Sequence, residues 1–144
     1  TVLITKSMMN SEIGFGRKVL QVLEEEGLSF EHMPSGIDTM TIVLHEDEFL
    51  PKEQQVISAI HRAVEPDAVE VEAGWSLVAV VGRGMRSAKG TAGRLFTALA
   101  KADINVRMID QGSSELNIII GVENKDFEKT IEAIYGEFIT PASK

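Results

Sequence analysis

The strongest constraint on the fold of this chain is an internal repeat. With an offset of 76 residues, small and apolar positions of the two halves coincide: Gly14 with Gly90, Leu23 with Leu99, Leu28 with Ile104, Gly36 with Gly112 and Ile42 with Ile118. The register holds over roughly 45 residues, and after a slip of two residues the segment 56–63 matches 130–137. A chain that repeats in this way is expected to fold as two similar modules, which we predict over residues 1–73 and 74–144.

Both halves show the same order of predicted strands and helices. In the first half, short β-branched or alternating runs predict strands at residues 2–5, 28–33, 39–44 and 68–74. Apolar residues at helical spacing predict helices, one containing Val19 and Leu23 and one at 52–64. In the second half the same patterns predict strands at 78–81, 104–109 and 116–120, and helices around Leu95 and at 125–138.

The order β-α-β-β-α-β is that of a ferredoxin-like module, an α+β fold whose antiparallel sheet carries its helices on one face. The uncovered face of such a small sheet is usually buried against another module or chain, so we expect a homodimer. The second half ends in "ITPASK", where Pro141 cannot donate a ladder hydrogen bond. The second module is therefore predicted to lack one strand of its own.

A glycine-containing turn joins the two middle strands of each module. Gly36 and Gly112 occupy equivalent places in these turns, among small polar residues. We predict that both glycines adopt positive φ, because glycine does so at no steric cost.

Composition excludes several classes of function. The formal net charge of −8 and the lack of clustered Lys and Arg argue against binding of nucleic acid or anionic membranes. The chain has no cysteine and no apolar run near the roughly 20 residues of a membrane helix. We expect a soluble, cytoplasmic protein whose partner is a small polar or cationic ligand. The chain begins with Thr1 directly before a predicted strand, as a piece of a longer protein would.

The loop "GRGMRSAKGTAGR" at residues 82–94 follows a strand and opens a helix, as phosphate-binding loops do. It matches neither nucleotide-binding template, because Lys89 precedes Gly90 and position 87 is serine. Free N–H groups at a helix start also favour a carboxylate, including that of an amino acid. In the equivalent loop of the first module, Asn10 or Ser11 could be a ligand-binding residue or a plain N-cap.

Ionisable residues point to binding rather than catalysis. The three histidines, His32, His45 and His61, lack the spacing of metal ligands, and no nucleophile with a base or carboxylate pair stands out. Glu12, Glu31 and Asp38 fall near the first loop, the second strand and the first turn. They could be ordinary solvated residues, or they could hold the ammonium groups of an amino acid through charge-assisted hydrogen bonds.

Two strings carry a family resemblance. "MNSEIGFGRKVLQVLEEEGLSFEHMPSGIDTMTIVL" and "QGSSELNIIIGV" resemble the paired ACT domains in the C-terminal regulatory region of bacterial aspartate kinase. The resemblance covers essentially the whole chain. It implies an allosteric region that binds an end product for feedback inhibition, lysine first, alone or together with threonine. The alternative is an ACT pair that serves only for dimerisation.

The resemblance also implies where the effector binds and what lies elsewhere. The effector site would consist of residues of the first loop, the second strand and the turn: Met9, Asn10, Ser11, Glu12, Gly14, Phe15, Ser29, Phe30, Glu31, Ser35, Gly36, Ile37 and Asp38. Gly16 stands where family members often carry a larger apolar residue. Catalysis with ATP and Mg²⁺ would belong to an upstream kinase domain. The first module would be inserted within the second, whose missing strand would come from upstream of Thr1.

Overall fold

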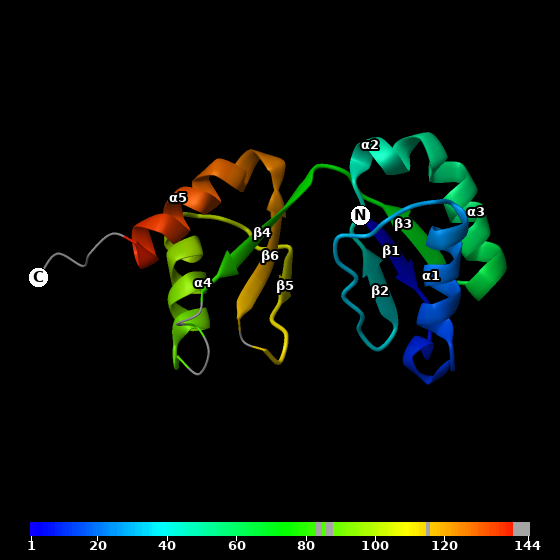
Figure 1. Cartoon of the computed structure of the whole chain (residues 1–144), viewed down its shortest axis with the longest axis horizontal. Helices are drawn as coiled ribbons and strands as arrows, with labels where there is room; N and C mark the ends of the chain where they lie inside the picture. Colours follow the sequence, from blue (N-terminus) through cyan, green and yellow to red (C-terminus); the bar gives the residue numbers. More distant parts are fainter. Residues whose placement is uncertain (83–84, 86–87, 115, 140–144) are drawn as a thin grey trace, which may run out of the picture. The chain divides into compact units, whose positions relative to one another are not determined.

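A computed structural model describes residues 1–82, 85, 88–114 and 116–139 of the chain. The chain divides into two compact units, Thr1–Ala73 and Gly74–Lys144. Each unit consists of an antiparallel sheet with its longer helices packed on one side, as Figure 1 shows. The predicted α+β architecture, a tandem ferredoxin-like pair, is confirmed.

The first unit has a three-stranded sheet and two long helices. Its elements are β1 (Val2–Thr5), η1 (Met9–Ser11), α1 (Phe15–Glu25), β2 (Thr39–Ile42), α2 (Glu46–Phe49), η2 (Leu50–Lys52), α3 (Glu53–Val64) and β3 (Ala68–Val71). The strand order is β2-β1-β3, so β1 is central and antiparallel to both neighbours. Val2 lies opposite both Ile42 and Val71. These residues share the helix-facing side, because side chains alternate along a strand.

The second unit repeats this plan. Its elements are β4 (Trp75–Val81), α4 (Thr91–Lys101), β5 (Met108–Asp110), β6 (Asn117–Glu123), η4 (Asn124–Asp126) and α5 (Phe127–Phe138). In the described part of this unit the sheet has three strands in the order β4-β6-β5. Strand β4 is therefore at an edge of that sheet. The tail at 140–144, on which the prediction of a missing strand partly rested, lies outside the described residues.

Apolar side chains of each sheet and its helices form a separate core. In the first unit, Ile4 of β1, Val19 of α1 and Ile60 of α3 are fully buried. In the second, Leu95 of α4 and Ile120 of β6 are fully buried as well. Burial of each such side chain stabilises the fold by about 1.5–3 kcal/mol. The helical spacing of apolar residues that predicted these helices thus also identified the helix faces that are buried.

Two of the predicted strands differ most in extent from the structure. Residues 28–33 form no ladder strand, and only single bridges join His32 to Val43 and Ser35 to Met40. Pro34 between these bridges has no N–H to donate, which interrupts the ladder. The predicted strand at 104–109 is reduced to β5, because the N–H of Ile104 donates to Leu99 O at the end of α4 instead.

The prediction for the turn glycines is wrong, and the structure removes one of the two alternatives for Asn10 and Ser11. Gly36 and Gly112 do not adopt positive φ, whereas Gly14 and Gly90 do, at 81° and 85°. These two glycines are repeat equivalents, and they are the N-caps of α1 and α4. Neither Asn10 nor Ser11 therefore caps α1. Left-handed backbone is required where the loop enters the helix rather than in the turn, and glycine meets that requirement without steric cost.

Candidate functional site

The first loop and the turn at residues 35–38 form one hydrogen-bonded unit. The N–H of Lys6 donates to Asp38 O at 2.8 Å, and the N–H of Asn10 donates to Ile37 O at 3.1 Å. Between them, the N–H of Met8 donates to the carboxylate of Asp38 at 2.9 Å. Met8 has a left-handed backbone with φ 62°, so the Asp38 carboxylate accepts from a strained residue. The predicted site consisted of the first loop, the second strand and the turn. The structure thus brings the loop and the turn together.

Glu12 is held by two lysine side chains. Its Oε2 lies 2.6 Å from Lys6 Nζ and its Oε1 lies 2.7 Å from Lys18 Nζ. These hydrogen bonds, first that of Lys18 and then that of Lys6, lower the pKa of the Glu12 carboxyl below its ordinary value. Both oxygens of Glu12 are therefore engaged by the protein itself.

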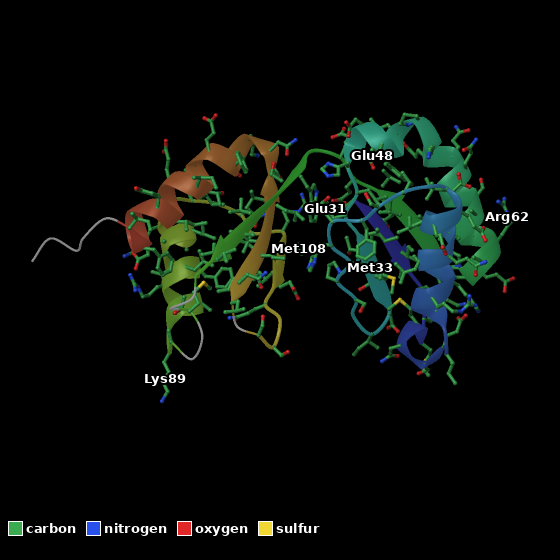
Figure 2. All side chains as sticks on the ribbon, viewed as in Figure 1. Glu31, Met33, Glu48, Arg62, Lys89 and Met108 are labelled. Atoms are coloured by element: carbon green, nitrogen blue, oxygen red, sulfur yellow. The ribbon has the colours of Figure 1, made fainter. Side chains whose placement is uncertain are left out.

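Glu31 belongs to a different part of the first unit. Its N–H donates to Val43 O at 2.9 Å, and its carboxylate lies 2.8 Å from His45 Nε2. Gly36, where the same chain segment reaches the turn, pairs with Thr39. Glu31 and Gly36 are five positions apart in the sequence, a span of at most about 16 Å at the rise of an extended strand. In Figure 2 the Glu31 label lies beside the upper half of the first unit, whereas the dark blue segment that follows β1 lies at its lower end.

The remaining candidate residues differ in accessibility. Met9 and Phe15 are buried in the core of the first unit and support the loop from beneath. Asn10, Ser11, Ser29, Gly36 and Asp38 are exposed, and Ile37 and Phe30 are exposed apolar residues. Gly16 faces Met40, because a Cβ added there would lie 3.8 Å from Met40 Cε. A larger side chain at position 16 would therefore contact the core residue under the turn.

Several residues that hold the site were missed by the sequence reasoning. Lys6 and Lys18 bind Glu12, His45 binds Glu31, and Asp67 accepts the N–H of Ser7 at 2.7 Å. Hydrogen bonds from Ser7 lower the pKa of the Asp67 carboxyl. The sequence offers one weak signal, since Lys6, Glu12 and Lys18 alternate in charge at a spacing of six residues.

The described part of the second unit carries an apolar groove. A hollow of about 390 Å³ runs between α5 and β4, which is an edge strand among the described residues. Apolar side chains of both elements line it, among them Val78, Val80, Ile134, Tyr135 and Phe138. The second loop, the counterpart of the first-unit loop, includes positions 83, 84, 86 and 87, which lie outside the described residues.

Two further classes of site find no support in the described part of the chain. No three His, Asp or Glu side chains of the described residues are grouped as a metal ion would require. Within the same ranges, no helix combines the length and the apolar character needed to cross a membrane.

Comparison with known proteins gives a consistent set of relatives. The model of the ACT domain matches residues 78–138. Aspartokinase 3 of Bacillus subtilis is 45% identical over 139 residues, which are 96% of this chain and 31% of that protein. The crystal structure of Clostridium acetobutylicum aspartate kinase superposes with a TM-score of 0.92 at 48% identity, over 95% of this chain and 32% of that one.

A more distant structure shares the fold. Escherichia coli aspartokinase III, solved in complex with lysine and aspartate, has a TM-score of 0.78 at 22% identity, over 96% of this chain and 31% of that one. The chain therefore spans about a third of the length of these relatives.

Proposed function

This chain is a pair of ACT modules homologous to the regulatory regions of aspartokinases, and from that premise we propose that it binds an amino-acid end product and thereby regulates an aspartate kinase. The 45% identity to aspartokinase 3 of Bacillus subtilis over 96% of the chain supports this function most directly. A regulatory region acts through the difference in the effector's affinity for two states of the whole enzyme. Feedback inhibition requires that the effector favour the less active state.

The effector site that we propose starts from the loop and turn of the first unit. Hydrogen bonds from Lys6, Met8 and Asn10 to the turn hold these two segments together. They present exposed backbone and the Asp38 carboxylate on one end of the unit. Such a rigid polar end can orient both the ammonium and the carboxylate of an amino acid at a low cost in entropy.

Lysine is the effector that we propose first, alone or together with threonine. Asp38 and Glu31 are acidic groups at exposed positions, and charged hydrogen bonds to an ammonium group are strong. Escherichia coli aspartokinase III was solved with lysine and aspartate, which supports the same choice.

We further propose that a second copy completes the site. Along the segment 31–36, Glu31 lies up to about 16 Å from the turn, which is longer than a lysine side chain, so we assign the two acidic groups to different copies. That segment forms the outer edge of the sheet, beyond β2. Antiparallel pairing of two such edges about a two-fold axis would bring the Glu31 of each copy to the turn of the other. The homodimer and the effector site then depend on one another.

Catalysis is proposed to lie outside this chain. ATP, Mg²⁺ and aspartate would bind a kinase domain joined upstream, and a cytoplasmic location belongs to the same proposal. A purified sample of this chain should accordingly transfer no phosphate from ATP to aspartate. Measurable turnover would contradict this division of labour.

Calorimetric titration with each of the twenty amino acids tests the proposed function. Lysine should bind saturably, and sedimentation should report about twice the chain mass of 15.7 kDa. A dimer that binds none of the twenty would leave dimerisation as the function of this ACT pair. A monomer at high micromolar concentration, with and without lysine, would contradict the shared site.

A further inference from the structure

The Lys6 side chain occupies a compact set of groups suited to a primary ammonium. Its Nζ lies 2.6 Å from Glu12 Oε2 and 2.5 Å from Val64 O. The same nitrogen lies 5.8 Å from the centroid of the Phe15 ring. An ammonium has three N–H donors and favours the face of an aromatic ring. A carboxylate, a carbonyl and a ring therefore surround the charge of Lys6.

The Val64 carbonyl belongs to the end of a helix. Val64 is the last residue of α3, and Glu65 after it has a left-handed backbone that ends the helix. The last carbonyls of a helix lack intrahelical donors and carry the negative end of its dipole. The Lys6 ammonium supplies a donor at this helix end, 58 residues away in the sequence. Its side chain is only 22% exposed.

Lys18 contacts the same carboxylate in a different setting. Its Nζ binds the other oxygen of Glu12, and its side chain is 35% exposed. Among the described residues, its Nζ contacts neither a carbonyl acceptor nor an aromatic ring. Together the two lysines give the cluster one positive charge in excess over Glu12. An effector ammonium that approached Glu12 would meet the positive charges of both lysines.

We propose that Lys6 is the tethered occupant of a primary-ammonium site formed by the Glu12 carboxylate, the Val64 carbonyl and the Phe15 ring, and that this occupancy excludes an effector's ammonium from Glu12. Lys6 is thereby a specificity-determining residue. Glu12 supports the loop, and Asp38 and Glu31 remain to recognise the cationic end of the effector. The part of this inference that concerns the effector rests on the proposed function.

The first test replaces the tethered ammonium by a free one. Lys6→Ala removes the atoms from Cγ to Nζ, which n-propylammonium reproduces. Propylammonium should raise the Tm of Lys6→Ala saturably, since a ligand that binds only the folded state stabilises it. Neither 1-propanol nor tetramethylammonium should do so, because one lacks the charge and the other lacks N–H donors. The wild type, Lys18→Ala and the double variant Lys6→Ala with Glu12→Gln should show no such rise.

Equal protection of Lys6→Ala by propylammonium and tetramethylammonium would overturn the ammonium site. If Lys6→Ala does not fold, the wild type reports the same site through hydrogen exchange of its lysine ammonium protons measured by NMR. Exchange at Lys6 should be slower than at Lys18, and equal rates would overturn the proposal.

The second test measures specificity. Norleucine has the carbon chain of lysine without the ε-ammonium, so the ratio of their dissociation constants reports recognition of that group. Freeing Glu12 in Lys6→Ala should raise the preference for lysine about tenfold, the value of one charged hydrogen bond. Lys6→Arg should keep the wild-type ratio. An unchanged ratio in Lys6→Ala would refute the role in specificity. If the wild type binds no amino acid, the proposed function fails, and the propylammonium result still decides the ammonium site.

Discussion

Substitution of Asp38 separates two roles of one carboxylate. Asp38 Oδ1 accepts the N–H of Met8 at 2.9 Å, and the proposed function also assigns this carboxylate to the effector's ammonium. Asp38→Ala removes the acceptor and the charge, whereas Asp38→Asn keeps an acceptor oxygen and removes only the charge. The backbone bond from Lys6 to Asp38 O is independent of the side chain and should persist in both.

The expected magnitudes follow from the exposure of this bond. A typical net hydrogen bond contributes about 0.5–1.5 kcal/mol, and this one is exposed, so Asp38→Ala should lower the free energy of unfolding by about 1 kcal/mol. Asp38→Asn should cost less, because Met8 keeps an acceptor. For lysine binding, loss of a charged hydrogen bond should cost about 1.5–3 kcal/mol, roughly 10-fold to 150-fold in affinity, in both variants.

Urea denaturation and lysine calorimetry on the same samples check this prediction. Glu31→Ala serves as a comparison, since its carboxylate contacts His45 rather than the loop. Glu31→Ala should weaken lysine binding to a similar degree and leave the hydrogen bond from Met8 to Asp38 intact. Wild-type affinity in both Asp38→Ala and Glu31→Ala would refute the effector assignment. Wild-type affinity in Asp38→Asn alone would show that Asp38 acts only by holding the loop.

Three further predictions concern the fold. Gly14→Ala should lower the free energy of unfolding by about 1–2 kcal/mol because φ is 81° there, whereas Gly93→Ala in α4 should raise it slightly. Thermal unfolding of both variants tests this prediction, and equal effects would contradict it. The pKa values of Glu12 and Asp67 are lowered in the folded state, so these carboxylates stabilise the fold fully above the ordinary carboxyl pKa, and this stabilisation is lost as pH falls through the folded-state values. The Tm should therefore drop below about pH 4. The double variant Glu12→Gln with Asp67→Asn should show a smaller drop. Adding roughly 20 upstream residues, enough for a strand and its connection, should slow hydrogen exchange in β4, the edge strand of the described sheet beside the apolar groove. Unchanged exchange would argue against the inserted-module topology.

Most of the fold could be predicted from periodicity. The helix boundaries of α3 and α5 agree with the apolar spacing within about two residues, the usual uncertainty of helix ends. Where the strand prediction was wrong, the hydrogen bonds open to the backbone decided. The segment 28–33 alternates like a strand, but its neighbour Pro34 and its position outside β2 reduce it to single bridges.

Part of the candidate site was predicted and part was not. The loop residues 9–12 and the turn at 35–38 were assigned to one site. Hydrogen bonds from Asn10, and from Lys6 and Met8 just before the predicted residues, join this loop to the turn. Three carboxylates were expected around that site. The structure engages Glu12 with lysines and places Glu31 beside His45. Spacing along the chain could not reveal this, because the partner of a charged group depends on how the chain folds back on itself.

The sequence by itself determined that the chain forms two similar modules, the order of their strands and helices, and the faces that are buried. These properties are local and periodic, so the spacing of apolar residues within each helix and strand is enough to predict them. Only the tertiary structure decided which acidic groups stay available to a ligand. Lys6 reaches the Val64 carbonyl across 58 residues, and such a contact exists only after β1 and α3 have packed on one core. Burial follows from residue type, whereas ion pairing depends on the path of the chain.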